Sequence, residues 1–192
     1  MSHRNCSGLY HLDDERDACG FGMVVQLDDQ PSRMLVDTAI GALSRMTHRG
    51  GVAADGLTGD GCGLLIRKAD GFLANAAGEA GIVLRPRFAA GNLFLPLDPA
   101  AAAHCRQVLE QELVRAGVEL AGWRMLPLDP SVCGALARDT LPRIEQLFVN
   151  AGVGQGEEDF ALALFLARRR AEQELAGQAD FYVTSLAPNS IS

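Results

Sequence analysis

The order of helix-like and strand-like patterns restricts the fold of this chain most. Apolar runs typical of buried strands are mixed with segments in which apolar residues recur every three or four positions, a spacing that predicts helices. The expected strands cover residues 19–27, 61–67, 92–97, 118–126, 144–150 and 180–186, and the expected helices cover residues 32–46, 98–116, 131–139 and 157–175. The two kinds of element intermingle without a regular β-α-β rhythm, so we expect an α+β fold rather than a doubly wound sheet.

Length and charge narrow the class of protein. With 192 residues, 48% of them hydrophobic and 21% charged, the chain has the composition of one globular domain. The net charge of -7 argues against nucleic acid or an anionic membrane as the main partner. Residues 1–18 lack the apolar core of a secretory signal, and no run is long enough to span a membrane.

The cysteines indicate a reducing compartment. Their number, five, is odd, and none are spaced as C-x-x-C, so we expect free thiols and a cytoplasmic location. Cys6 lies in the segment 1–18, whereas Cys105 and Cys133 lie in predicted helices and are expected to be packed.

Cys19 stands where this polar leader meets the apolar run of residues 21–27. Taken alone, such a cysteine is more often a small packed residue than a nucleophile. Two neighbouring features favour a nucleophilic role for Cys19, because Gly20 leaves room beside the thiol and the charged leader is expendable. Once the leader is removed, Cys19 carries a free α-amine with an ordinary pKa of about 8, which would serve as the base for its own thiol.

Other polar residues have a structural and a functional interpretation. Arg49 is either a charge that favours a helix C-terminus or a group that holds the nucleophile's strand or a substrate carboxylate. His48 is a second candidate for the base, and Asp60 is more typical of a turn than of an acid catalyst. The glycine-rich segment 59–63 lacks the spacing of a phosphate-binding loop, and Cys62 within it is expected in the core. No His, Cys or Asp cluster has metal-ligand spacing, so we expect no metal site.

An ordered set of motifs resembles the N-terminal glutamine amidotransferase domain of the glutamate synthase large-subunit family, a type 2 amidotransferase with the N-terminal-nucleophile hydrolase fold. The motifs are Gly8-Leu9-Tyr10, Glu15 to Gly22, His48-Arg49-Gly50, Gly59 to Gly63 and Phe181 to Leu186. They occur in the family's order across most of the chain. The resemblance implies a four-layer αββα sandwich, with residues 1–18 as a propeptide-like leader and residues 19–192 as a partial amidotransferase domain.

The resemblance also implies a reaction and its participants. Cys19 would become the first residue, and its thiolate would attack the side-chain amide of L-glutamine, release ammonia and form a thioester that water hydrolyses. Arg49 would lie beside the nucleophile and support it. The ammonia would pass to a synthase domain or subunit that aminates and reduces 2-oxoglutarate, with FMN and an iron–sulfur cluster bound there and no cofactor in this chain.

The sequence departs from the family pattern near its end. The family domain continues to a substrate-binding arginine, an Asn-Gly pair that forms the oxyanion hole and an aspartate for the substrate amine, whereas no arginine follows Arg170 here and no asparagine precedes a glycine. We therefore expect a sandwich that is incomplete at its C-terminus, and a truncated chain whose own glutaminase activity is low. The alternative is a catalytically inactive remnant or regulatory module of the same fold.

Overall fold

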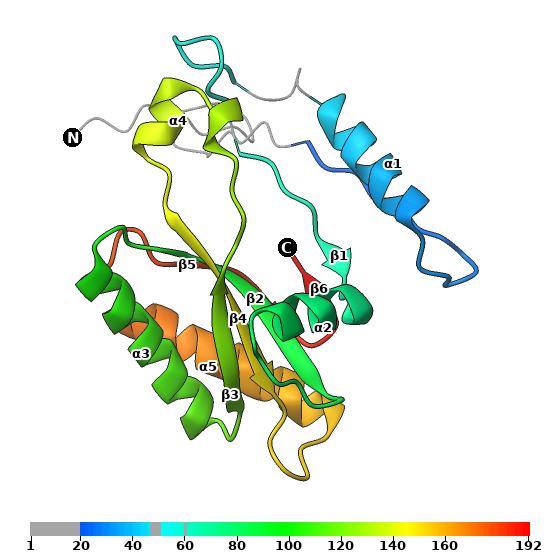
Figure 1. Ribbon diagram of the computed structural model, residues 1–192, viewed down its shortest axis with the longest axis vertical. Coiled ribbons are helices and arrows are strands. Elements are labelled where there is room, and N and C mark those ends of the chain that lie inside the picture. The colour runs from blue at the N-terminus through cyan, green and yellow to red at the C-terminus, as the bar shows by residue number, and fades with distance from the viewer. Residues whose placement is uncertain (1–19, 47–50, 60) are drawn as a thin grey trace, which may run out of the picture. The chain divides into compact units, whose positions relative to one another are not determined.

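The computed structural model describes residues 20–46, 51–59 and 61–192. The chain divides into two compact units, with the boundary between Cys62 and Gly63, and each is considered by itself. Helix α1 (Arg33–Ser44) belongs to the first unit, and every other helix and strand of Figure 1 belongs to the second.

In the first unit, α1 confirms the helix predicted over residues 32–46. Its N-terminus is capped by Ser32, whose hydroxyl oxygen accepts a hydrogen bond from the Leu35 N–H at 3.2 Å. The predicted buried strand over residues 19–27 is wrong where the structure describes it. Residues 20–26 have no ladder partner, and Phe21 is 94% exposed. An apolar run becomes a strand only where a neighbouring strand pairs with its backbone, and none of the described residues supplies one.

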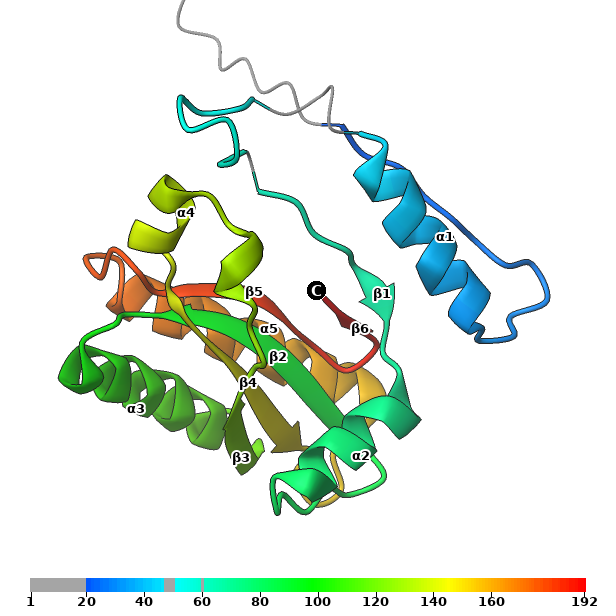
Figure 2. The same ribbon diagram turned by 45° about the horizontal axis from the view of Figure 1, so that its top comes forward.

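The second unit is built on a four-stranded antiparallel sheet of order β3-β4-β2-β5 (Figure 2). Its strands are β2 (Phe88–Leu95), β3 (Glu119–Met125), β4 (Arg143–Asn150) and β5 (Tyr182–Ala187). Gly91 lies where β5 approaches β2 closely, because a β-carbon there would be 2.5 Å from the Ser185 carbonyl oxygen. All four strands overlap the segments predicted for them.

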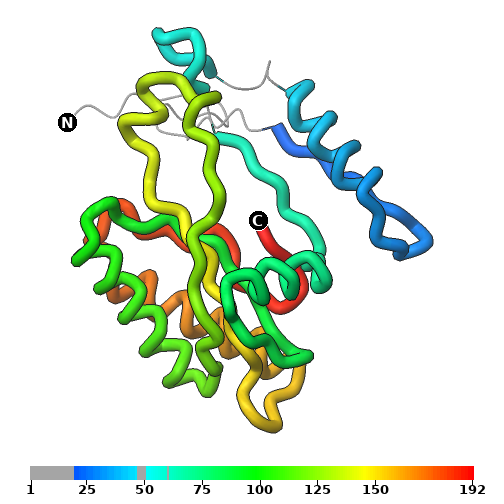
Figure 3. Tube along the Cα trace, viewed as in Figure 1, coloured from blue at the N-terminus to red at the C-terminus, as the bar shows by residue number. Residues whose placement is uncertain are grey.

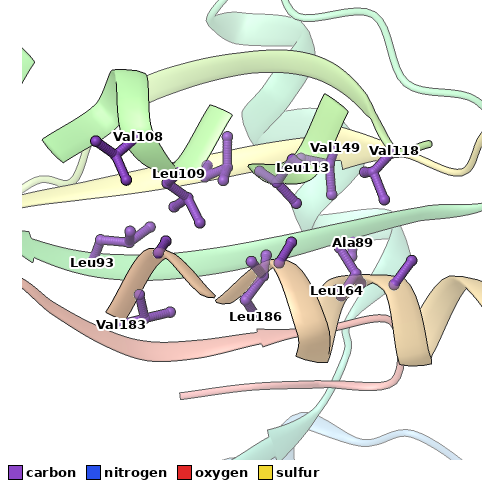
Figure 4. Packing of buried hydrophobic residues seen from close by; sticks show 14 of the residues in the cluster. Ala89, Leu93, Val108, Leu109, Leu113, Val118, Val149, Leu164, Val183 and Leu186 are labelled. Atoms are coloured by element: carbon purple, nitrogen blue, oxygen red, sulfur yellow. The ribbon is translucent and has the colours of Figure 1, made fainter. Parts of the chain in front are cut away.

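Helices α3 (Pro99–Arg115) and α5 (Glu157–Glu174) cover one face of this sheet. Asp98 caps α3 through a 2.7 Å hydrogen bond from the Ala101 N–H, as the Asp-Pro pair predicts. Apolar residues at three- and four-residue steps along α5 and just after it are buried, namely Phe160, Leu164, Ala167, Ala171 and Leu175. Side chains of both helices and of the strands point into one shared apolar cluster (Figure 4).

A smaller layer packs on the other face of the sheet. It consists of α2 (Asp70–Glu79) and of strands β1 (Ile66–Arg67) and β6 (Ser190–Ile191), which pair with each other. The last residues turn back along β5, as the red end of the trace shows in Figure 3, and the Ser192 N–H donates to Ser185 Oγ at 3.0 Å. Of the strand predicted over residues 61–67, only Ile66 and Arg67 are in a strand, since β6 is just two residues long.

Two further elements complete the second unit. A 3₁₀ turn, η2 (Pro130–Val132), and a five-residue helix, α4 (Ala135–Asp139), replace the helix predicted over residues 131–139, because Gly134 separates them. Helices combined with antiparallel sheets confirm the predicted α+β class.

Candidate functional site

The residues predicted to react lie outside the described part of the chain. Both Cys19 and Arg49 fall there, as do His48 and Asp60. What the structure describes is the segment that joins the His48-Arg49-Gly50 motif to the glycine-rich motif at residues 59–63.

This joining segment is a tight loop closed by its own backbone. Val52 and Gly59 form an antiparallel bridge, and the Ala53 N–H donates to the Thr58 carbonyl oxygen at 2.7 Å. The two motifs therefore adjoin the two paired ends of one short loop in the sequence. Within the described residues, this pairing brings Val52 and Gly59 side by side.

Asp55 organises the loop from inside. Its carboxylate accepts hydrogen bonds from the Leu57 N–H at 3.1 Å, the Thr58 N–H at 2.7 Å and the Thr58 hydroxyl at 2.6 Å. Gly56 follows with a φ of +69°, a conformation that glycine adopts without steric cost. Sequence reasoning missed this turn, although the Asp55-Gly56 dipeptide is a known turn signal.

The described cysteines differ in what they can do. Cys62 is exposed, so its predicted place in the core is wrong, because the strand that would have buried it does not form. Cys105 is fully buried in α3 as predicted, and burial raises the pKa of its thiol above the ordinary value. Cys133, expected to be packed, is half-buried after the 3₁₀ turn. A raised pKa disfavours the thiolate, so Cys105 is a packed residue rather than a nucleophile.

A row of polar side chains crosses the sheet on the face opposite α3 and α5. The Arg124 Nε–H donates to Gln146 Oε1 at 2.8 Å, and Gln146 Nε2 donates to Asn92 Oδ1 at 2.8 Å. These residues are register partners on β3, β4 and β2, and Asn92 is in turn paired with Ser185 of β5. The row fixes the register of the strands, because a slip by one residue would break its side-chain bonds.

At one end of the helix-covered face of the sheet, a buried carboxylate forms ion pairs that link α3 to β4. Glu145 of β4 is 1% exposed and pairs with Arg106 of α3, whose Nη1 is 3.3 Å from Oε2, and with Arg143 of its own strand. Two positive groups compensate the one buried charge, so this cluster joins α3 to β4 as a structural contact.

Neither a metal-binding cluster nor a membrane-crossing helix occurs in the described residues. Within residues 20–46, 51–59 and 61–192, no group of three or more His, Cys, Asp or Glu side chains is arranged to hold a metal ion. None of the helices in that same part of the chain has the length and apolarity needed to cross a membrane.

Comparison with known proteins gives a consistent match. The family model described as class-II glutamine amidotransferases matches residues 19–192. The glutamate synthase [NADPH] large chain of Azospirillum brasilense is 37% identical over 189 residues, which cover 96% of this chain and 12% of that protein.

Two relatives named as ferredoxin-dependent enzymes match over a similar span. Ferredoxin-dependent glutamate synthase 2 of Synechocystis is 34% identical over 94% of this chain, and the chloroplastic/mitochondrial ferredoxin-dependent glutamate synthase 1 of Arabidopsis thaliana is 33% identical over 96%. In each case the chain spans 12% of the relative's length.

Proposed function

This chain belongs to the class-II glutamine amidotransferases, and from that premise we propose that it releases ammonia from L-glutamine with Cys19 as the nucleophile. The observation that carries the proposal is where the family match begins, because its first residue is Cys19. Residues 1–18 are then a leader whose removal exposes the Cys19 amine, and residues 19–192 are the amidotransferase part of the chain.

The proposed reaction has two acyl-transfer steps. The α-amine of Cys19 accepts the thiol proton, and the thiolate adds to the carbon of glutamine's side-chain amide. The tetrahedral intermediate collapses to a thioester as the amide nitrogen takes a proton and leaves as ammonia. Water then attacks the thioester, which releases glutamate and restores the thiol.

Arg49 has a supporting role in this proposal. A guanidinium is charged at every relevant pH and has five N–H donors in a fixed plane, so it can stabilise a thiolate or hold a chain segment beside it. The Asp55 loop supports the assignment, since it ties together the segments that follow Arg49 and precede Cys62.

The wider reaction is proposed from the longer relatives. They are named as glutamate synthases, so the ammonia would be used by a synthase domain or subunit to make glutamate from 2-oxoglutarate. The FMN and iron–sulfur cluster of that step would be bound by the synthase part, because iron–sulfur clusters need several gathered cysteines. An odd number of cysteines without C-x-x-C spacing supports a cytoplasmic location for this chain.

The test is covalent labelling with a glutamine analogue that carries a diazoketone in place of the side-chain amide. We expect mass spectrometry of the leader-free chain to find the label on Cys19, and the Cys19→Ala variant to stay unlabelled. Cys62→Ala is the matched control, because Cys62 is an exposed cysteine next to a glycine and its loss should leave labelling unchanged.

A second comparison tests the base. The α-amine is tied in a peptide bond while the leader is attached, so labelling should be much slower in the chain that retains residues 1–18. Equal labelling rates with and without the leader would rule out the α-amine as the base, and labelling of Cys62 in place of Cys19 would overturn the assignment of the nucleophile.

A further inference from the structure

The outer side of α5 is unexpectedly apolar for a surface helix. Leu162 and Phe165 are each 57% exposed, and Leu166 beside them is 38% exposed. The other side of the same helix is already packed against α3 and the sheet. An amphipathic helix normally has a polar outer side, so three exposed apolar residues within two turns need an explanation.

Charged residues continue this surface in both directions along the helix. Glu158, Leu162, Phe165 and Arg169 follow one another at steps of four, three and four residues, which places them in one line along α5. We call these four residues the α5 ridge. Its acidic end lies in the first turn of the helix, and its basic end lies about 16 Å away at 1.5 Å per residue.

The α5 ridge of one copy is complementary in charge and apolar character to the ridge of a second copy that runs in the opposite direction. In an antiparallel pair of α5 helices, Glu158 of one copy faces Arg169 of the other, and Leu162 faces Phe165. The same two pairs recur on the other side of the two-fold axis, so one surface supplies both halves of the contact. A parallel pair would place Glu158 against Glu158 and Arg169 against Arg169.

We propose that the α5 ridge is a self-association surface, through which a second copy of this chain docks with its α5 antiparallel. The apolar residues form the centre of the contact and the charged residues form its rim, the usual arrangement of a protein interface. Arg169 is free to take part, since its side chain is 65% exposed and its pairing with Glu172 uses only one of its five N–H groups.

The predicted dimer is weak. One helix against one helix lies at the small end of interface sizes, so we expect a dissociation constant on the order of tens of micromolar. Association through α5 is independent of the chemistry of Cys19.

The test is sedimentation equilibrium of the 192-residue chain over a series of concentrations. Phe165→Glu puts a charge at the centre of the contact twice, once from each copy, and should raise the dimer dissociation constant at least tenfold. Val114→Glu is the matched control, because Val114 is 64% exposed on α3 and lies outside the ridge. It should change the constant less than about twofold, and circular dichroism should show both variants folded.

Charge reversal tests the antiparallel arrangement. Glu158→Arg alone and Arg169→Glu alone each place like charges at both ends of their own dimers, so each variant should associate several-fold more weakly than the unmodified chain. An equimolar mixture of the two restores opposite charges at both ends and should recover most of the association.

Three results would overturn the proposal. They are a chain that stays monomeric at every concentration, a dimer that Phe165→Glu does not weaken, and a mixture of the reversed variants that associates no better than either alone. The first result would leave the ridge to another segment of a longer polypeptide.

Discussion

Replacing Gly91 by alanine tests how closely β2 and β5 are packed. The added β-carbon would lie 2.5 Å from the Ser185 carbonyl oxygen and 2.9 Å from Leu186 Cδ1. The Leu186 Cα would be 3.2 Å away, so two of the three nearest atoms belong to the backbone and cannot move without moving β5. Since carbon contacts are relaxed near 3.5–4.0 Å, the strands would have to separate by roughly 1 Å here.

The expected cost follows from that separation. Overpacking of a well-packed core costs about 1–3 kcal/mol, and widening β2–β5 strains ladder hydrogen bonds as well. Alanine also lowers the conformational entropy of the unfolded chain, which stabilises the folded protein by about 0.4–1 kcal/mol. We therefore expect Gly91→Ala to lower the free energy of unfolding by about 1–2 kcal/mol.

The same substitution at Gly78 is the matched control. Gly78 lies in α2 and is exposed, and a β-carbon added there would meet nothing within 4 Å. Alanine favours the helix there, so Gly78→Ala should raise the free energy of unfolding by about 0.5–1 kcal/mol. Urea denaturation followed by circular dichroism measures both changes, and a Gly91→Ala protein as stable as the original would refute the close packing of the two strands.

Three further predictions concern buried groups. Glu145→Gln removes the charge that two arginines share, and thermal unfolding should show the folded state destabilised by about 1–3 kcal/mol. Glu157→Gln, at an exposed position, should change the stability little. Equal effects of the two substitutions would contradict the buried ion cluster. In the native chain iodoacetamide should modify Cys62 and spare Cys105 until denaturant is added, and rapid modification of Cys105 would show that it is accessible. Burial raises the pKa of the Cys105 thiol, so the contribution of this buried thiol to the free energy of unfolding is present below the ordinary thiol pKa and is lost as the pH rises above that value. Cys105→Ala should therefore flatten the alkaline decline in stability, and an unchanged pH profile would argue against a raised thiol pKa.

Sequence patterns predicted the helices and strands that carry strong local signals. Helix α3 has a capping aspartate and a first-turn proline, and α5 has an apolar residue at each inward step, so both were predicted close to their observed bounds. The ten-residue α2 was not predicted. It has two glycines and only Leu73, Ala76 and Ala77 are buried, so its periodicity is weak.

What could not be predicted depends on partners elsewhere in the chain. The apolar run after Cys19 looks like a buried strand, but whether a strand forms is decided by a neighbour that pairs with it. The polar row through Gln146 depends on the register of several strands, which no single strand reveals. The assignments of Cys19 and Arg49 stay predictions that rest on motifs and on the family match.

The strand order has a consequence for how this protein is made. β2 pairs with β4 and β5, which are both synthesised after it, so the sheet cannot close when β2 leaves the ribosome. At a translation rate of about 5–20 residues per second, β2 waits on the order of ten seconds for β5. Helix α3 is made early in that interval, and until β4 and α5 follow, its apolar side has only β2 and β3 to cover it. A nascent chain of this order is exposed to aggregation until β5 pairs with Gly91 and its neighbours, so the close approach of β2 and β5 is among the last contacts to form.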